Sequence, residues 1–395
     1  MNPLSQKELA ALAGTRSGPW VSLYETVGVT NEATDAATIR LKDRLRECEN
    51  ALVRSGMRPT DARALVSPIS SLVEDNLASV RGCRGLAIFA SPEGCRIERL
   101  PVEVEDVAWV GPRPYIRPLI ALVQRNRPFW LLGISQNRAR LFRGDMHGLT
   151  EEQVPDMPIA LAEVIDTGSR DGTQQSHTAK AGTSVKQDAA FHGQGGLADH
   201  RKTNIIKFFR EVDRALQAHL RGDTGPLLFT GVDYLYPLFA SVTRHPQLLD
   251  EHIAENPDRL TAEELYRQAE RLLHRLWEHK QAEVVRSFEN GLGSCEVSDE
   301  VHVILPAAAA GQVKSLLVRQ SGPLWGTFDS EHGKIHVDHE QRPGTEDLLD
   351  RACAEVLLHG GGVFAVPWQK IKTGAPLAAI FRYALSPPPT ASAVK

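Results

Sequence analysis

Short apolar runs that alternate with longer amphipathic segments constrain the fold of this chain most strongly. Residues 129–134 form a run without charge, which predicts a central strand, and residues 139–143 are predicted to be its hairpin partner. Residues 200–220 then place apolar side chains at intervals of three and four, which is typical of an amphipathic helix. A further buried strand is predicted at residues 227–230. A strand, a hairpin, a helix and a strand in this order predict an α/β layer domain.

The same alternation continues on both sides of this segment. The elements predicted upstream are strands at 20–24, 85–90 and 94–100, helices at 38–56, 59–76 and 118–124, and an extended connector at 101–114. The elements predicted downstream are a long helix at 260–290, which begins at a capping box formed by Thr261 and Glu264, helices at 301–313 and 346–358, and strands at 315–319, 325–328, 335–338, 362–366 and 378–383. The downstream elements predict an α/β/α sandwich.

The chain is therefore expected to be an α/β protein with three domains. Their predicted bounds are residues 1–126, 127–275 and 276–385, and a loose tail follows at 386–395. Residues 167–190 are rich in Gly, Ser, Thr, Gln and Lys and are predicted to form a flexible loop.

Composition limits the class of protein. The 395 residues carry a formal net charge of -4, which excludes binding of nucleic acid through bulk charge, so any such contact requires a local basic surface. The 5 cysteines are scattered without a CxxC pair, as expected in a reducing compartment. Residues 1–15 lack an apolar signal core, and no apolar run is long enough to span a membrane. We therefore expect a cytoplasmic protein without membrane contact.

Residues 111–143 form the first candidate basic surface. They contain seven arginines and no Asp, Glu or Lys, and the planar guanidinium is suited to bind two phosphate oxygens at once. These arginines are Arg113, Arg117, Arg125, Arg127, Arg138, Arg140 and Arg143. An ordinary solvated surface, with acidic partners elsewhere in the fold, explains such a run equally well.

Residues 191–197, Phe-His-Gly-Gln-Gly-Gly-Leu, are predicted to form a glycine loop in front of a basic helix that starts at about residue 200. Between residues 191 and 222 the basic residues are Arg201, Lys202, Lys207, Arg210, Arg214 and Arg221, and the acidic ones are Asp199, Glu211 and Asp213. Six cations and three anions leave a balance of +3. An amphipathic helix after a flexible linker is the alternative, but linkers rarely concentrate glycine beside His and Gln.

Other chemistries are not supported by the spacing of residues. The glycine loop follows no strand and precedes no Gly-Lys-Ser/Thr, so it is neither a dinucleotide nor a P-loop motif. Residues 129–135 lack the carboxylates of a two-metal nuclease. His332, His336 and His339 are predicted to lie on a surface hairpin, because Gly333 interrupts any helix that would align them. We expect no metal site and no cofactor.

The order of several short motifs resembles that of a known family. Residues 191–195, Phe-His-Gly-Gln-Gly, precede a basic helix and are similar to the Phe-His-Gly-x-Gly pattern of the bacterial archaeo-eukaryotic release factors, family three. Further resembling segments are residues 20–24, 129–143, 231–235, 305–311 and 374–383. The resemblance extends over nearly the whole chain and includes the class-one release factors and Pelota.

The resemblance implies a ribosome-binding protein with three domains. The first domain would reach the decoding centre, and a central RNase H-like domain would carry residues 191–197 to the peptidyl-transferase centre. The third, similar to kink-turn-binding ribosomal proteins, would meet a translational GTPase, for which elongation factor Tu is the bacterial candidate. The residues expected to contact ribosomal RNA are His192, Gly193, Gln194, Gly195, Gly196, Arg201, Lys202, Lys207, Arg138 and Arg140.

The sequence departs from the release factors at the tip. Their Gly-Gly-Gln glutamine helps to place a water at the peptidyl-tRNA ester, whereas Leu197 follows Gly195 and Gly196 here. The stop-codon-reading motifs Asn-Ile-Lys-Ser and Tyr-Cys are also absent from residues 1–126. The first hypothesis is therefore an A-site occupier, in hibernation or rescue, without hydrolysis. The alternatives are a peptidyl-tRNA hydrolase that uses Gln194, which release surviving Gln194→Ala would contradict, and a non-ribosomal interaction protein, which a tight non-ribosomal partner would favour.

Overall fold

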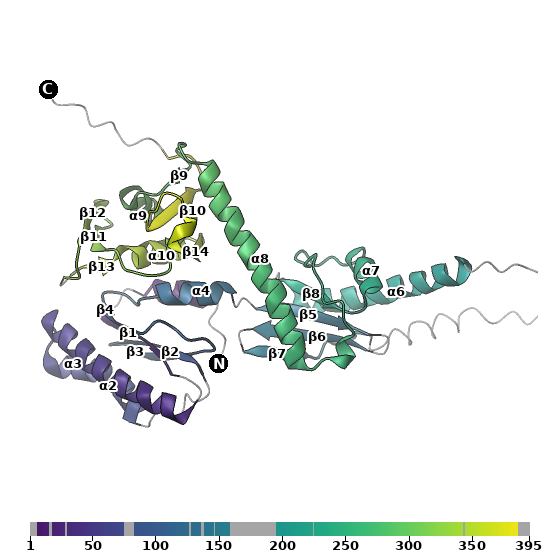
Figure 1. Ribbon diagram of the computed structural model, residues 1–395, viewed down its shortest axis with the longest axis horizontal. Coiled ribbons are helices and arrows are strands. Elements are labelled where there is room, and N and C mark those ends of the chain that lie inside the picture. Colours follow the sequence, from purple (N-terminus) through teal and green to yellow (C-terminus); the bar gives the residue numbers. More distant parts are fainter. Residues whose placement is uncertain are drawn as a thin grey trace, which may run out of the picture. The chain divides into compact units, whose positions relative to one another are not determined.

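The computed structural model describes residues 6–15, 18–27, 30–74, 83–125, 128–135, 138–145, 147–158, 195–223, 225–342 and 344–385 (Figure 1). Helices alternate with strands that form four sheets, which confirms the α/β class. Contacts divide the chain into two compact units. The first unit contains Met1–Asn126 and Trp277–Lys395, and the second contains Arg127–Leu276. The division into three domains stays a prediction.

The N-terminal part of the first unit is an antiparallel sheet of order β3-β2-β1-β4 that is packed against two helices. Its elements are α1 (Gln6–Ala13), β1 (Trp20–Thr26), α2 (Asn31–Arg54), α3 (Pro59–Glu74), β2 (Gly85–Ser91), β3 (Gly94–Leu100), β4 (Val107–Gly111) and α4 (Arg117–Arg125). Alternate residues of β1, Val21 and Leu23, share one buried cluster with Leu41 of α2 and Ile69 of α3.

The C-terminal part of the first unit is a mixed sheet of order β14-β10-β15-β9. Its elements, with those of a small sheet of order β12-β11-β13, are β9 (Val297–Ser298), α9 (Val301–Ala309), β10 (Val313–Arg319), β11 (Trp325–Asp329), β12 (Lys334–Val337), β13 (Glu346–Asp347), α10 (Leu348–Leu358), β14 (Gly362–Val366) and β15 (Leu377–Phe381). Trp277 of α8 (Ala262–Asn290) stacks on Phe364 of β14 with ring centroids 5.5 Å apart. Both α9 and α10 also contact this sheet.

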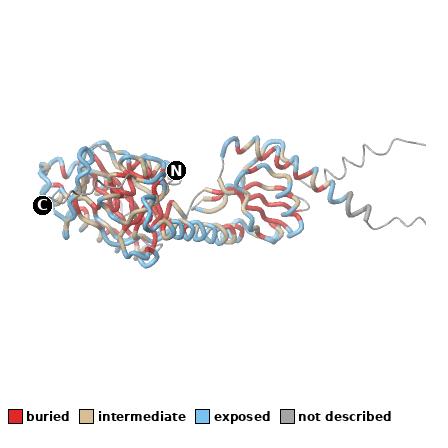
Figure 2. Tube along the Cα trace, turned by 90° about the horizontal axis from the view of Figure 1, so that it is seen from above, coloured by how far each residue is buried: buried red, intermediate tan, exposed pale blue. Residues whose placement is uncertain are grey.

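The second unit is a sheet of order β7-β6-β5-β8 with a helix on each face. Its elements are β5 (Phe129–Ile134), β6 (Ala139–Asp145), β7 (Gly148–Glu152), α6 (Gly195–Leu220), β8 (Leu227–Thr230), α7 (Tyr236–Ala240) and the N-terminal half of α8. Strands β5 and β8 are parallel, and the other two pairs are antiparallel. Phe209 of α6 packs on one face of the sheet, and Leu265 of α8 packs on the other. Figure 2 shows that buried residues follow the strands of this sheet.

The structure corrects several predicted bounds. The predicted connector 101–114 contains β4, whose residues pair with β1. Residues 301–313 divide into α9 and the start of β10, since Gly311 adopts a φ of 71° that ends the helix. Helix α2 begins at Asn31 rather than at residue 38, because Thr30 caps it by accepting a hydrogen bond from Ala33 N at 3.2 Å.

The predicted glycine loop 191–197 is also corrected. Helix α6 begins at Gly195, so Gly195, Gly196 and Leu197 are helical rather than part of a loop. The N–H groups of a first helical turn have no partner within the helix, so glycine there loses fewer interactions than in a helix interior. Residues 191–194 and the predicted flexible loop 167–190 lie outside the described residues.

Candidate nucleic-acid interface

Helix α6 presents one apolar face to the core of the second unit. Phe208, Phe209 and Val212 are fully buried. The Phe209 ring meets Phe239 edge-on, with centroids 5.5 Å apart, and contacts Phe229 of β8 in the same way at 6.4 Å. Burial of aromatic side chains of this size is worth about 1.5–3 kcal/mol each. The helix is therefore held firmly by one face, and its other face is left to solvent.

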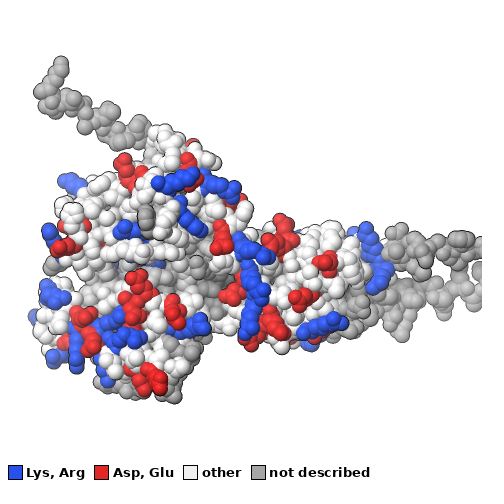
Figure 3. Space-filling view, viewed as in Figure 1, with Lys and Arg blue, Asp and Glu red and all other residues white. Residues whose placement is uncertain are grey.

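The opposite face of α6 carries a basic stripe. Lys207, Arg210 and Arg214 recur at intervals of three and four, so they lie on one side of the helix, and all three are exposed. None of them forms an ion pair with another described residue. We call these three residues the α6 stripe. Figure 3 shows a patch of Lys and Arg atoms at the end of the second unit that adjoins the grey residues.

Asp213, the buried acidic residue of this helix, does not neutralise the α6 stripe. Asp213 is 2% exposed, and its carboxylate accepts hydrogen bonds from Arg244 Nε at 3.0 Å and Thr243 Oγ1 at 3.0 Å. Glu211 lies four residues after Lys207 and three before Arg214, so it is exposed on the same side of α6 and leaves this side with a balance of +2; it forms no ion pair with another described residue. The sequence count set Asp213 against the basic residues of this segment, but in the structure Asp213 pairs with Arg244. Arg210 and Arg214 were also left out of the predicted site, although their spacing from Lys207 indicated a common face.

The residues predicted to contact RNA fall into three groups. Arg201, Lys202 and Lys207 are exposed on α6. Gly195 and Gly196 are the first residues of this helix. His192, Gly193 and Gln194 lie outside the described residues, so the hydrolase candidate Gln194 has no structural account.

Arg138 and Arg140 lie in the hairpin of β5 and β6 and are engaged within the second unit. Arg138 Nη2 lies 3.3 Å from Glu151 Oε1, and the Arg138 side chain is 54% exposed. Arg140 is 15% exposed, and its Nη2 donates to the Pro257 carbonyl at 2.7 Å and lies 3.6 Å from Asp258. The Arg140 guanidinium also lies over the ring of Phe142 in the same strand, 5.1 Å from its centroid. Arg140 is therefore largely buried within the second unit, which limits its access to an external phosphate.

Arg117, from the same arginine run, is enclosed in the first unit. Its Nη2 lies 3.1 Å from Asp347 Oδ2 and donates to the Tyr115 hydroxyl at 2.7 Å. The side chains of Arg117 and Asp347 are 5% and 0% exposed. Burial acts to lower the pKa of Arg117, but Asp347 and Tyr115 outweigh it and raise that pKa, so the guanidinium stays charged. Arg117 is a structural residue and not a phosphate ligand.

Asp350 and Glu355 of α10 extend this buried network. Asp350 Oδ1 accepts from the N–H groups of Ile116 at 2.8 Å and Arg117 at 2.7 Å, which caps the first turn of α4. Burial, followed by repulsion from Asp347, raises the pKa of Asp350 to about 8, although the two N–H groups act in the opposite direction. Glu355 Oε1 lies 3.3 Å from Arg113 Nη1. Glu355 and Asp347 thus balance Arg113 and Arg117, although each acid lies more than 200 positions away in the sequence.

Neither a metal centre nor a membrane segment emerges from the part of the chain that the structure describes. There, no three His, Cys, Asp or Glu side chains are grouped so that they could bind a metal ion. No described helix has the length and apolarity needed to cross a bilayer. His332 and His336 lie on the hairpin of β11 and β12 with side chains 66% and 76% exposed, as predicted.

Comparisons with known proteins show similarity to a release factor-like family that is related to Pelota. Residues 128–312 match the model of the bacterial archaeo-eukaryotic release factor family 3, in agreement with the resemblance that the motifs indicated. This segment contains nearly the whole second unit, including α6. No curated protein matches the chain.

Solved structures of low identity also match. A model of ribosome-bound archaeal Pelota and ABCE1 shares 13% identity over 98% of this chain and 96% of that chain, with a TM-score of 0.39. S. cerevisiae Dom34, described as a translation termination-like factor that interacts with Hbs1, shares 11% identity over 76% of this chain and 80% of that chain, with a TM-score of 0.38. An archaeal termination factor, aRF1, shares 15% identity over 96% and 98%, with a TM-score of 0.22.

Proposed function

We propose that this protein is a cytoplasmic translation factor that occupies the ribosomal A site in hibernation or rescue, without reading a stop codon. The observation that carries the proposal is the α6 stripe, which lies on the helix that leads directly from the glycine segment. Its three cations are exposed and have no ion pair among the described residues. Such a surface suits the phosphate backbone of ribosomal RNA, which dominates the affinity of nucleic-acid binding.

We propose that the second unit is an RNase H-like domain that carries residues 191–197. Its sheet has the order β7-β6-β5-β8, and parallel bridges join Leu227 to Leu248 and Thr230 to Ile253 beyond β8. The described residues of β5 and β8 carry no carboxylate, so the fold would serve here as a scaffold rather than as a nuclease. We infer that α6 directs residues 191–197 towards the peptidyl-transferase centre.

The C-terminal part of the first unit is proposed to contact a translational GTPase, with elongation factor Tu as the bacterial candidate. The support is the motif resemblance of residues 305–311, which form the end of α9 and the turn after it. Analogy of this kind identifies a class of partner and not a contact surface. Failure of the purified chain to bind elongation factor Tu, with and without ribosomes, would contradict this part of the proposal.

The proposal is tested by sedimentation of the purified chain with 70S ribosomes, followed by a peptidyl-tRNA release assay on the pellet. Binding without release is the expected result. Binding with release that Gln194→Ala abolishes would instead favour the hydrolase. If no association were seen at low salt, where phosphate contacts are strongest, the ribosomal function would be wrong.

A further inference from the structure

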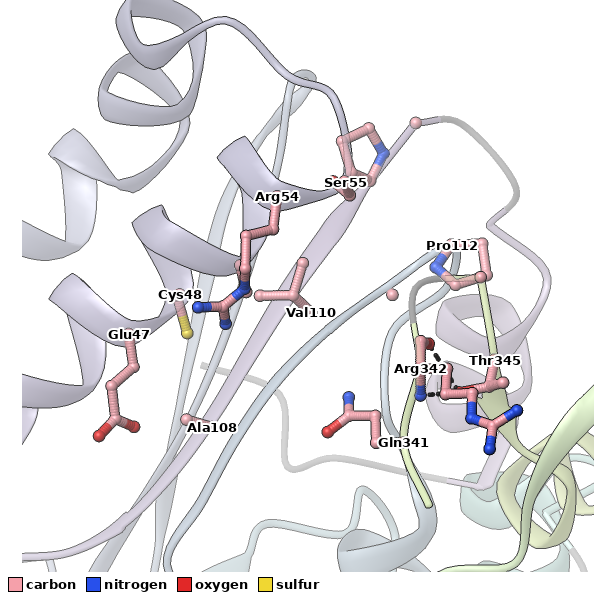
Figure 4. A pocket seen from close by; sticks show the side chains of 15 residues that line it. Glu47, Cys48, Arg54, Ser55, Ala108, Val110, Pro112, Gln341, Arg342 and Thr345 are labelled. Atoms are coloured by element: carbon pink, nitrogen blue, oxygen red, sulfur yellow. Dashed lines mark hydrogen bonds between the residues drawn. The ribbon is translucent and has the colours of Figure 1, made fainter. Parts of the chain in front are cut away.

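A pocket of about 710 Å³ in the first unit is not explained by ribosome binding. It lies between α2, the end of β4 and a segment formed by Gln341, Arg342, Gly344 and Thr345 (Figure 4). Pockets that bind small molecules have volumes of about 300–1,000 Å³ and combine an apolar lining with a few polar groups. This pocket has both properties.

Helix α2 supplies two opposite charges to one side of the pocket. Glu47, Ala51 and Arg54 are spaced by four and three residues, so they line the same face of the helix. Seven residue steps separate Glu47 from Arg54, which places their backbone positions about 10.5 Å apart along the helix axis. Both charged side chains are exposed, and neither forms an ion pair with another described residue. The pocket therefore has an anionic end and a cationic end.

The surface between the two charges is apolar. Ala51, Ala108, Val110 and Cys48 line it, and in the view of Figure 4 the Arg54 guanidinium lies between Cys48 and Val110. Burial, followed by repulsion from Glu47, raises the pKa of the Cys48 thiol to about 12. The thiol therefore stays neutral and acts as part of the apolar floor rather than as a nucleophile.

The loop opposite α2 contributes an amide. Gln341 points towards the α2 side of the pocket in Figure 4, and its side chain has no partner among the described residues. The loop is closed on itself, because Arg342 N donates to Thr345 Oγ1 at 2.9 Å and Thr345 N donates to the Arg342 carbonyl at 3.0 Å. The Arg342 guanidinium lies 3.7 Å from Asp338 Oδ1 and is paired with that carboxylate.

We propose that this pocket binds a free nucleoside 5′-phosphate, with guanine as the preferred base. Arg54 would bind the phosphate, since a guanidinium forms paired hydrogen bonds with phosphate oxygens. The base would lie on the apolar floor. Glu47 would accept hydrogen bonds from the N1–H and the exocyclic amine of guanine, which are adjacent donors. Adenine presents an acceptor at N1 beside its amine and would be repelled by the carboxylate.

The charge arrangement favours a free nucleotide over an RNA strand. An RNA chain carries phosphates on both sides of each base, and one of them would approach Glu47 unfavourably. A mononucleotide has one anionic end and one end with donors, which matches the two ends of the pocket. The Gln341 amide is suited to a ribose hydroxyl, because it both donates and accepts hydrogen bonds.

The test is isothermal titration calorimetry of the full chain, without ribosomes, against GMP, guanosine and AMP. GMP is expected to bind, and guanosine and AMP to bind at least about tenfold more weakly, because each lacks one charge-assisted interaction. Absence of GMP binding would overturn the proposal, as would equal binding of GMP and AMP. Binding of a short single-stranded RNA without binding of GMP would also overturn it and would assign the pocket to RNA.

Three variants attribute the binding to the pocket. Arg54→Met should weaken GMP binding at least about tenfold and remove its advantage over guanosine. Glu47→Gln should reduce the preference for GMP over AMP. Arg46→Met, on another face of the same helix with a side chain 79% exposed, is the matched control and should bind GMP as the unmodified chain does. All three positions are exposed, so folding should be unaffected. Unchanged GMP binding in Arg54→Met and Glu47→Gln would contradict the assignment.

Discussion

The arginine run at residues 111–143 and the α6 stripe are both rich in cations, but the fold uses them differently. Arg117 and Arg140 are enclosed, with side chains 5% and 15% exposed, and each has an acidic neighbour. Lys207, Arg210 and Arg214 are exposed and have no ion pair among the described residues. The denser run of cations is thus mainly structural, and the sparser one is the better candidate for binding.

This difference shows that the density of charge in a sequence is a poor guide to its availability. The partners of the run come from distant segments, as Asp347 and Glu355 illustrate. On α6, the local acid Asp213 is directed to Arg244 instead of to the stripe. Whether a cation is available for RNA therefore depends on tertiary contacts that a linear count of charges does not contain.

The largest expected effect is the loss of stability on substitution of Arg117. Arg117→Met should destabilise the first unit by about 3–5 kcal/mol, because removal of one partner leaves Asp347 buried and unpaired. Urea denaturation followed by tryptophan fluorescence measures the loss. Arg214→Met is the matched control and should change stability by less than about 0.5 kcal/mol. Similar losses at the two positions would break the distinction between the two regions.

The buried network around Arg117 should also make stability depend on pH, through Asp350, whereas the exposed α6 stripe should not. The folded chain keeps a proton on Asp350 up to about pH 8, whereas an unfolded aspartate releases it at about pH 4. The folded state therefore binds more protons between these values. Stability due to this group is fully present below about pH 4 and is lost as the pH rises to about 8, by up to about 1.4 kcal/mol per unit.

Asp350→Asn tests this origin, since asparagine keeps the oxygen that accepts from Ile116 and Arg117 but does not titrate. Urea denaturation of both chains from about pH 5 to about pH 8 should give a flatter profile for the variant. Parallel profiles would mean that Asp350 does not carry the proton.

A smaller effect is expected at Arg140. Arg140→Met should lower stability by about 1–3 kcal/mol, because the Pro257 carbonyl loses its charged donor. Ribosome association should not change, since this guanidinium is committed to the second unit. Thermal unfolding and sedimentation measure the two properties. A loss of association without a loss of stability would indicate that Arg140 contacts RNA, as the sequence predicted.

Much of the fold could be predicted from local patterns. The apolar runs of β2, β5 and β8 were located by their composition, and the capping box was confirmed, with Glu264 N donating to Thr261 Oγ1 at 3.2 Å and Thr261 N to Glu264 Oε2 at 2.9 Å. Strand β4 was missed because a short edge strand between prolines is defined by its pairing with β1 and not by an apolar run.

The candidate site was less predictable. The spacing of Lys207, Arg210 and Arg214 could have identified a common face, but the sequence does not show that Asp213 pairs with Arg244. The pocket on α2 was not predicted, because Glu47 and Arg54 meet the end of β4 and the segment that contains Gln341 only after folding. Contacts between distant segments define both features.

The most direct test of the central claim is sedimentation of the chain with 70S ribosomes from about 50 to about 200 mM salt, with and without the α6 stripe. The variant is Lys207→Gln/Arg210→Gln/Arg214→Gln. The matched control is Arg267→Gln/Arg271→Gln/Arg275→Gln on α8, which removes the same charge from other exposed positions of the second unit. Loss of the α6 stripe should weaken binding and reduce the logarithmic salt slope by about 2–3, whereas the control should bind as the unmodified chain does. Equal binding by the two triple variants would contradict the assignment of α6 to ribosomal RNA.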